Sequence, residues 1–195
     1  MDRTRCGWCS EDPLYIAYHD QEWGRPLRDE AQLFEMLCLE GQQAGLAWIT
    51  VLKKRQCYRQ HFFQYSIADI AALSDQALQD KLQDRGLIRH PAKLAAIRTN
   101  AQAWLQLQQQ GINLVDWLWQ FVDHQPEQHA VPDYRSAPTY TAASVALSKA
   151  LKKQGFQFVG PTICYAFMQA VGMVNDHEDH CVFKSLPPLA EEHSS

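Results

Sequence analysis

The sequence predicts an all-α protein. No segment shows sustained period-two alternation, and neither Asn-Gly nor Asp-Gly, the strongest hairpin signals, occurs. Apolar residues instead recur at helical spacing between capping and stop signals. With 195 residues, 46% of them hydrophobic and 21% charged, the chain has the size and composition of one globular domain, or of two small lobes around one cleft.

In the N-terminal half, helices are expected where a capping residue precedes an apolar run. Asp29 is a suitable N-cap for EAQLFEMLCLEGQQ, and a break at residues 44–46 leads into a second helix within AWITVLKKRQCYRQHFF. Ser66 and Asp69 have the spacing of a capping box. Ser74 can cap a further short helix, DQALQDKLQD.

In the C-terminal half, proline and glycine mark the boundaries. Pro91 suits the first turn of a long helix, AKLAAIRTNAQAWLQLQQQ, which Gly111 ends. A short helix is expected around 114–121, and two more in SVALSKALKKQ and TICYAFMQAV. Residues 124–141 are expected to form a loop, of a length that usually indicates function or mobility. We expect a single domain over residues 1–183 and a disordered tail over 184–195.

Charge and hydropathy exclude several classes of protein. The 18 Lys and Arg against 22 Asp and Glu give a net charge of −4, which excludes a globally basic nucleic-acid binder but allows a local basic patch. No apolar stretch reaches the roughly 18 residues that a membrane span needs. The N-terminus lacks the apolar core of a secretory signal, so we expect a cytoplasmic protein with reduced cysteines.

Cysteine and histidine occur in pairs at the two ends of the chain. Cys6 and His19 lie near the N-terminus, and His177 and Cys181 lie near the C-terminus with His-x3-Cys spacing. Two Cys and two His can form a closed, structural zinc site, which would join the two ends. The alternatives are that the four residues are unrelated, that Cys6 instead pairs with Cys9 in a CxxC motif, or that His180 replaces one of the histidines.

Glu40 and a group of aromatic residues form the second candidate site. Glu40 ends an apolar run, where a carboxylate is either half-buried with a raised pKa, placed at a cleft wall, or simply solvated near a helix end. The aromatic residues flanking it in sequence are either core or the walls of a pocket. Flat rings with one carboxylate would suit a planar heterocycle that carries an exocyclic amine. These aromatic residues are Trp8, Tyr15, Tyr18, Trp23 and Trp48.

The segment LKKQGFQFVGPT is typical of a helix-hairpin-helix motif. Gly155 and Gly160 bound the short connection, and Gly160 would let the backbone N–H groups of the next helix, up to Thr162, approach a phosphate. Lys153 and its neighbouring lysines add local positive charge. The alternative is an ordinary helical hairpin whose glycines serve only the turn. A second basic turn, RGLIRHP at residues 85–91, is a weaker candidate.

Long segments of the chain resemble the 3-methyladenine DNA glycosylase I family. The resemblance is carried by CGW, DPLYIAYHDQEWG, LFEMLCLEGQQAGLAWITVLKKR and FQFVGPTICYAFMQAVGMVNDH, and it spans from about Arg5 to Cys181. It implies a two-lobed, all-helical member of the helix-hairpin-helix DNA glycosylase superfamily. It also implies excision of 3-methyladenine from alkylated double-stranded DNA, with the free base as product.

The resemblance further implies roles for individual residues. One structural zinc ion per chain would be bound by Cys6, His19, His177 and Cys181. Glu40 would recognise the base and act as the catalytic residue, and Tyr18 and Trp48 would sandwich it, with Trp8, Tyr15 and Trp23 around them. Gly45 and Leu46 match the loop that enters the DNA where the base has left. Asp176 lies roughly where other superfamily members carry a catalytic Asp, but we assign it no such role.

The expected reaction is hydrolysis of the N-glycosyl bond by a monomer, without strand cleavage, because no lysine is obviously placed to form a Schiff base. Two other functions remain possible from the sequence. A DNA-binding module without catalysis would need no cavity at Glu40. A zinc hydrolase for small molecules would need an open metal position, which two Cys and two His would fill.

Overall fold

The structure is a computed structural model that describes residues 4–185, and over this range it is mostly helical, as predicted. Its helices are α1 (Pro13–Gln21), α2 (Glu30–Gln43), α3 (Trp48–Tyr58), α4 (Ile67–Ala71), α5 (Asp75–Lys81), α6 (Pro91–Gln109), α7 (Leu114–Trp119), α8 (Ala142–Lys153) and α9 (Pro161–Ala170). A π-helical turn, η1 (Arg59–Phe63), continues α3, and two 3-10 turns are η2 (Gln120–Val122) and η3 (Tyr134–Ser136).

The capping signals read from the sequence act as expected. The Asp29 carboxylate accepts the backbone N–H of Gln32, and Ser66 and Asp69 form a complete capping box. Gly111 adopts a φ of +76° at the end of α6. Helix α1 is not among the elements expected from the sequence, although Asp12 caps it and proline occupies its first position. Its hydrophobic residues form no clear stripe, which explains why periodicity does not reveal it.

The loop expected over residues 124–141 is partly regular. It contains η3 and a two-residue strand, β1 (Glu127–Gln128), which pairs in parallel with β2 (Val174–Asn175). This short pairing is an addition to the predicted helical fold. Two residues cannot show a period, and the partner strand lies far away in sequence, so only the fold reveals this pairing.

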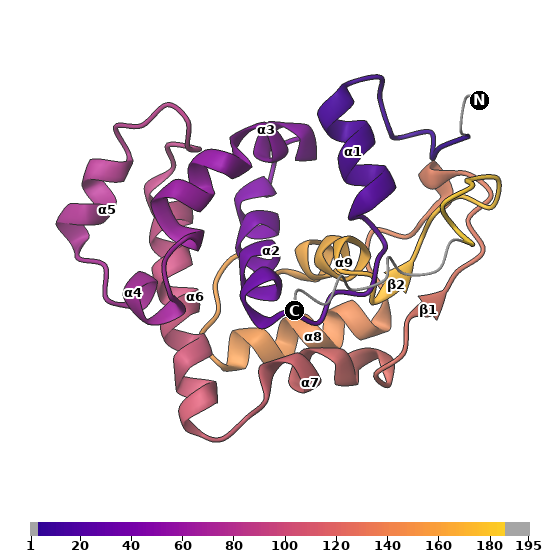
Figure 1. Cartoon of the computed structure of the whole chain (residues 1–195). Helices are drawn as coiled ribbons and strands as arrows, with labels where there is room; N and C mark the ends of the chain where they lie inside the picture. Colours follow the sequence, from indigo (N-terminus) through magenta and orange to yellow (C-terminus); the bar gives the residue numbers. More distant parts are fainter. Residues whose placement is uncertain (1–3, 186–195) are drawn as a thin grey trace, which may run out of the picture.

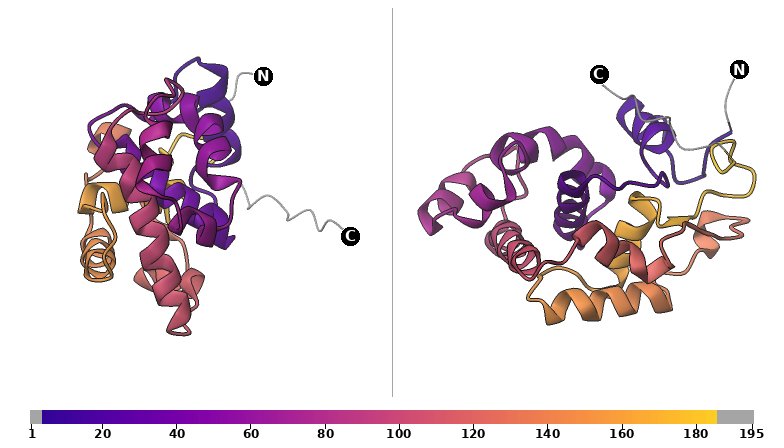
Figure 2. Two further views of the ribbon diagram at one scale, coloured as in Figure 1. Left: turned by 90° about the vertical axis from the view of Figure 1, so that its left-hand side faces the viewer. Right: turned by 60° about the horizontal axis from the view of Figure 1, so that its bottom comes forward.

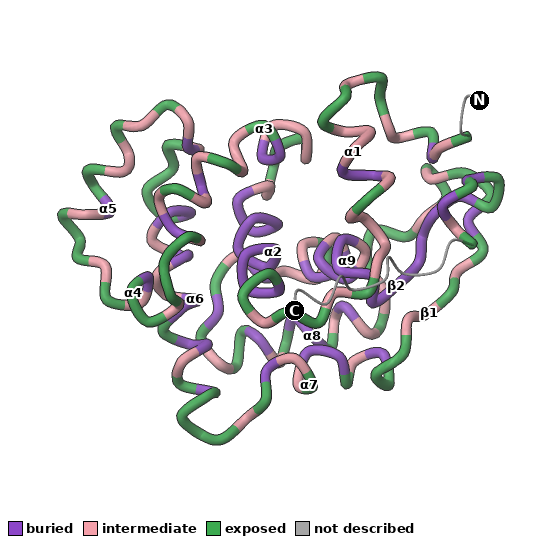
Figure 3. Tube along the Cα trace, viewed as in Figure 1, coloured by how far each residue is buried: buried purple, intermediate pink, exposed green. Residues whose placement is uncertain are grey.

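Helix α2 is the centre of the molecule. It contacts α3, α6, α7 and α9, and residues 33–42 are all buried. Helices α3–α6 lie on one side of it, and α7–α9 with the small sheet lie on the other (Figures 1 and 2). In Figure 3 the trace of α2 is buried along most of its length. This arrangement agrees with the predicted two-lobed fold and places Glu40 between the two groups of helices.

The two ends of the described chain meet beside α1 and α9. The backbone N–H of Val182 donates to the carbonyl of Thr4, at 3.1 Å. The Lys184 ammonium donates to the carbonyls of His129 and His177, at 2.6 and 2.9 Å, so the chain is held at this residue. Residues 186–195, which make up most of the predicted tail, lie outside the described residues. Between residues 4 and 185, no helix combines the length and apolarity needed to cross a membrane.

The segment after α1 runs closely along the end of α9. The backbone N–H groups of Gly24 and Leu27 donate to the carbonyls of Gln169 and Val171, each at 3.0 Å. A Cβ atom at Gly172, whose φ is +69°, would lie 2.2 Å from the carbonyl carbon of Arg25. Only glycine fits here, because the atoms that would face a side chain at this position are backbone atoms of Arg25 and Pro26, which cannot move aside.

We therefore expect Gly172→Ala to destabilise the fold by about 3 kcal/mol or more, through a backbone clash added to left-handed strain. Gly111→Ala is the matched control, since its φ is +76° but a Cβ there would meet nothing within 4 Å. That variant should lose only about 1–2 kcal/mol. Urea denaturation of both variants measures the difference, and equal losses would contradict the close approach at Gly172.

Candidate active site and metal cluster

A cavity of about 240 Å³ opens between α1, α2 and α9. It contains the predicted base-binding residues, and the structure adds residues that sequence reasoning did not assign to it. The predicted members are Trp8, Tyr15, Tyr18, Trp23, Glu40 and Trp48, and the additional ones are Gln43, Tyr134, Ala137, Ala166, Gln169 and Asp176. Aromatic walls around one glutamate can hold a flat, polar ring.

Glu40 is the electrostatic feature of this cavity. Its side chain belongs to the buried central helix and only 4% of the residue is exposed. Burial raises its pKa to about 8, against an ordinary value of about 4.5. No donor among residues 4–185 lies within hydrogen-bond distance of its carboxyl group, whereas the nearby Glu35 pairs with Arg59. A buried acceptor that the protein leaves unpaired is suited to a donor supplied by a ligand.

Tyr18 and Trp48 lie together at one wall of the cavity. Their ring centroids are 5.4 Å apart and the planes are inclined by 44°. A third ring between them would need roughly 7 Å, which is twice the usual carbon–carbon contact distance. The two rings as they lie here leave too little space for a base between them, although a base can contact their exposed faces or edges. The sandwich stays a prediction. Burial raises the pKa of Tyr18 well above its ordinary value, so its hydroxyl is a neutral donor.

Asp176 is a cavity residue whose carboxylate is fully engaged by the protein. His129 lies 2.6 Å from Oδ1, while Oδ2 accepts from the Tyr165 hydroxyl and from the Gln169 amide at 2.7 Å. These contacts fix Asp176 in the wall and contrast with the unpaired Glu40. Sequence reasoning left its role open, and the only signal for its position was its place beside His177.

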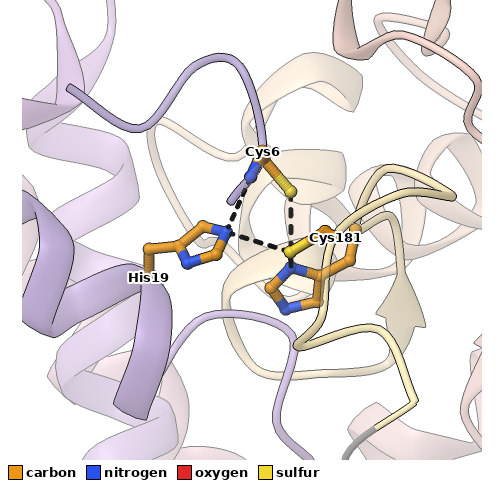
Figure 4. A group of neighbouring side chains, drawn as sticks. Cys6, His19 and Cys181 are labelled. Atoms are coloured by element: carbon orange, nitrogen blue, oxygen red, sulfur yellow. Dashed lines mark hydrogen bonds between the residues drawn. The ribbon is translucent and has the colours of Figure 1, made fainter. Parts of the chain in front are cut away.

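Cys6, His19, His177 and Cys181 converge in one buried cluster, as the sequence suggested. Figure 4 shows how Cys6, His19 and Cys181 of this cluster face one another. His177 Nδ1 lies 3.4 Å from Cys6 Sγ and 3.5 Å from Cys181 Sγ, and His19 Nε2 lies 3.7 Å from Cys181 Sγ. In a tetrahedral zinc site, bonds of about 2.3 Å to sulfur and 2.0–2.1 Å to nitrogen place these atoms about 3.6 Å apart. The four residues thus have the spacing of a metal site.

The surroundings of the cluster also suit a metal. His19 Nδ1 lies 2.8 Å from the Asp20 carboxylate, which Arg5 holds in turn, and His177 Nε2 lies 3.2 Å from the carbonyl of Trp23. Partners of this kind fix the ring orientation of metal-binding histidines. Hydrogen bonds from the Cys6 thiol and from both imidazoles stabilise a thiolate at Cys181 and hold the pKa of that thiol well below its ordinary value.

The alternative ligands lie outside the cluster. The Cys9 thiol faces the carbonyl of Ser10 at 3.7 Å. His180 is half exposed and lies 3.8 Å from a Glu178 oxygen. The CxxC interpretation is therefore wrong, because the turn after Cys6 points Cys9 elsewhere.

The cluster of two cysteines and two histidines shares two neighbouring side chains with the cavity. The Trp8 ring packs against His19 and Trp23, at centroid distances of 5.1 and 4.8 Å, and Trp23 packs against His177 at 4.7 Å. Both tryptophans also line the cavity. A ligand set at the chain ends thereby positions rings that would face a bound base.

The predicted DNA-contacting residues lie on two exposed turns. In the connection between α8 and α9, Gly155 has a φ of +90°, whereas Gly160 has an ordinary φ and open space where a Cβ would be. Lys153 and Thr162 are exposed beside it. Asn100 on α6 holds this turn through the backbone of Gln157.

The second exposed turn follows α2. Gly45 has a φ of +77°, and Leu46 beside it is an exposed apolar side chain, with 38% of the residue exposed. Gln43, a cavity residue, donates from its side-chain amide to the Leu46 carbonyl at 2.8 Å. The exposed leucine is thus tied directly to the rim of the cavity.

A second cavity, of about 210 Å³, lies on the other side of Tyr18. Its glutamates are paired, Glu22 with Arg55 and Glu35 with Arg59. It therefore offers a ligand no unpaired carboxylate comparable to Glu40.

Comparison with known proteins agrees with this site. The methyladenine glycosylase family model matches residues 8–185. The DNA-3-methyladenine glycosylase 1 of Escherichia coli K12 is 58% identical over 177 residues, which cover 91% of this chain and 95% of that protein. A crystal structure of 3-methyladenine DNA glycosylase I superposes with a TM-score of 0.90 at 56% identity, covering 92% of this chain and 98% of the other.

A further relative carries information about the ligand. A variant of 3-methyladenine DNA glycosylase I, solved in complex with 3-methyladenine, matches with a TM-score of 0.89 at 32% identity, over 93% of this chain and 98% of that one. Sequence, fold and the composition of the cavity therefore lead to one conclusion: this chain belongs to the methyladenine glycosylase family.

Proposed function

We propose that this protein removes 3-methyladenine from alkylated DNA by hydrolysis of the N-glycosyl bond. The observation that carries the proposal is Glu40, a buried carboxyl group without a protein donor in an aromatic cavity. A DNA-binding module would need no such cavity. A small-molecule zinc hydrolase is disfavoured because the cluster is buried and has four ligands.

The chemistry of the lesion explains why one carboxylate suffices. Methylation at N3 gives the base a positive charge, so its bond to the sugar is already weak. Ionised Glu40 would pair with the cationic base and accept a hydrogen bond from its exocyclic amine. The aromatic walls would exclude water from the base and hold it in the flipped position. Catalysis would then consist of capture, orientation and charge stabilisation of a base that leaves readily.

Two features support simple hydrolysis. The residues that line the cavity include no lysine, so no amine is placed there to form a Schiff base and cleave the strand. Asp176 is engaged by three protein donors, which supports a structural role for it. Because one chain supplies the whole cavity, we propose that the protein acts as a monomer, on DNA in the cytoplasm.

For the cluster at the chain ends, we propose one structural zinc ion per chain. Two thiol and two imidazole groups at tetrahedral spacing suit zinc, and no ligand position is left for a substrate. Bound zinc would supply a covalent link between the segments before α1 and after β2. Its contribution to the reaction would be indirect, through Trp8 and Trp23.

For DNA, we propose that the turn between α8 and α9 binds phosphate and that Leu46 enters the duplex. The first proposal is supported by the exposed N-terminus of α9 and by Lys152 and Lys153 in the last turn of α8. The second is supported by an exposed apolar side chain at the rim of the base cavity. An apolar wedge can stabilise the gap that a flipped base leaves.

Glu40→Gln should slow single-turnover excision and weaken binding of free 3-methyladenine, because it removes the charge and places an amide donor opposite the amine. An unpaired buried group of this kind costs roughly 1–3 kcal/mol. We expect reduced activity and not complete loss, since the charged base leaves easily. Cys9→Ser, prepared and assayed in the same way, is the control variant. Unchanged excision rate and binding affinity in Glu40→Gln would refute the role of this carboxylate.

The pH dependence tests the same residue independently. For wild-type protein, kcat/KM should rise with pH through about 8 as Glu40 ionises, and Glu40→Gln should lack this limb. The stability of the fold should depend on pH in the opposite direction. A raised pKa means that the folded state holds the proton more tightly, so wild-type stability falls between about pH 4.5 and 8, by up to about 1.4 kcal/mol per unit. Glu40→Gln should therefore gain stability relative to wild type over this window in denaturation experiments.

The zinc proposal predicts coupled loss of metal and stability. Cys6→Ser should lower zinc content and thermal stability together, since a structural zinc contributes on the order of 10 kcal/mol to folding at neutral pH. Cys9→Ser, three residues away, should keep both. Elemental analysis beside calorimetry measures this, and full zinc occupancy in Cys6→Ser would overturn the assignment.

The hairpin proposal predicts weaker binding to all DNA without loss of fold. Gly160→Val introduces a side chain into space that the protein does not use, so it should keep the melting temperature and reduce affinity for any duplex alike. Lys153→Ala should reduce the salt dependence of binding, because fewer counterions are released. Fluorescence anisotropy at several salt concentrations measures both. Normal binding by Gly160→Val would identify the connection as a turn only.

A further inference from the structure

A second group of metal-binding side chains lies among helices α3–α6, away from the cluster at the chain ends (Figure 1). Cys57 comes from the last turn of α3, His61 from the π-helical turn η1, and Asp84 from the turn after α5. One ligand atom from each lies within 4.8 Å of the others. A thiol, an imidazole and a carboxylate are the three groups that zinc-like ions bind in proteins.

The distances between these groups suit a metal ion. Cys57 Sγ lies 3.6 Å from Asp84 Oδ2, which matches the sulfur–oxygen edge of a tetrahedral site. His61 Nε2 lies 2.8 Å from the same oxygen, within hydrogen-bond distance. Binding would open this contact by roughly half an ångström, to the nitrogen–oxygen spacing of such a site. The His61 and Asp84 side chains are 28% and 42% exposed, so they have room to move.

The backbone around the three residues is built closely against them. Asp84 Oδ1 accepts the N–H of Gly86 at 2.6 Å, which orients the carboxylate. A Cβ atom at Gly86 would lie 2.5 Å from Cys57 Sγ, and the φ of Gly86 is not in the left-handed region. Glycine is therefore needed here for space beside the thiol. His61 is carried by a π-turn, in which Gln64 N–H bonds to the Arg59 carbonyl, and such turns occur frequently at functional sites.

We propose that Cys57, His61 and Asp84 bind a second divalent transition-metal ion of the zinc class. Three protein ligands leave a fourth position open to solvent, in contrast to the buried, four-ligand cluster at the chain ends. This second ion is held less tightly and exchanges readily. The metal must also displace the proton of the Cys57 thiol on binding, which weakens the site further. Bound there, the ion links α3 and η1 to the turn that precedes α6.

The test uses folded protein produced with Co²⁺ in place of zinc, which is then titrated with a competing chelator and followed by thiolate-to-cobalt charge-transfer absorption. Wild-type protein should bind two equivalents, a tight one and a weak one that the chelator removes first. Cys57→Ser and His61→Ala should each keep the tight equivalent and lose the weak one. In Cys57→Ser the charge-transfer absorption at saturation should fall by about one third, because one of three thiolate ligands is gone.

Cys9→Ser is the matched control, because its partly exposed thiol belongs to neither ligand set, and it should bind two equivalents with full absorption. The tight equivalent serves as an internal check that each variant is folded. Saturation of wild-type protein at one equivalent, or retention of the weak equivalent by both Cys57→Ser and His61→Ala, would overturn the proposal. The group would then be an ion pair with a neighbouring thiol.

Discussion

The closure of the chain ends by Cys6, His19, His177 and Cys181 is the constraint on which the rest of the site depends. The four residues come from the segment before α1, from α1 itself and from the segment after β2. These short segments have little apolar surface of their own, so a shared set of ligands can hold them where packing alone would be weak. Trp8 and Trp23 pack on this cluster and at the same time line the cavity that contains Glu40.

The other half of the cavity depends on α2. This helix is buried from Leu33 to Gln42, and Lys93 from α6 donates to the carbonyls of Gln42 and Ala44 at its C-terminus. These hydrogen bonds satisfy carbonyls that a helix end leaves unpaired and place a positive charge at the negative end of its dipole. Glu40 is therefore rigidly held while its own carboxyl group is left without a protein partner. The fold bears the cost of that unpaired group, as is common at functional sites.

The site combines a buried cavity with two exposed turns. Gln43 on α2 lines the cavity and bonds to the backbone of the exposed Leu46. Asn100 on α6 bonds to the backbone of the turn between α8 and α9. In the function proposed here, base capture at Glu40, a leucine at the cavity rim and a backbone that approaches phosphate would supply the three contacts that extraction of a base from a duplex requires. The overall negative charge does not oppose this, because phosphate contacts depend on local charge.

The sequence by itself determined the local structure of this protein. Asp29, Ser66, Ser74 and Pro91 act within one helical turn, so their effect does not depend on the rest of the fold. The family resemblance also named Glu40 and the four metal-binding residues. Only the tertiary structure decided that Cys9 lies outside the cluster, that Asp176 is fully engaged, that β1 pairs with β2 and that Cys57 meets His61 and Asp84. These outcomes depend on contacts between residues far apart in the chain, which spacing and periodicity cannot specify.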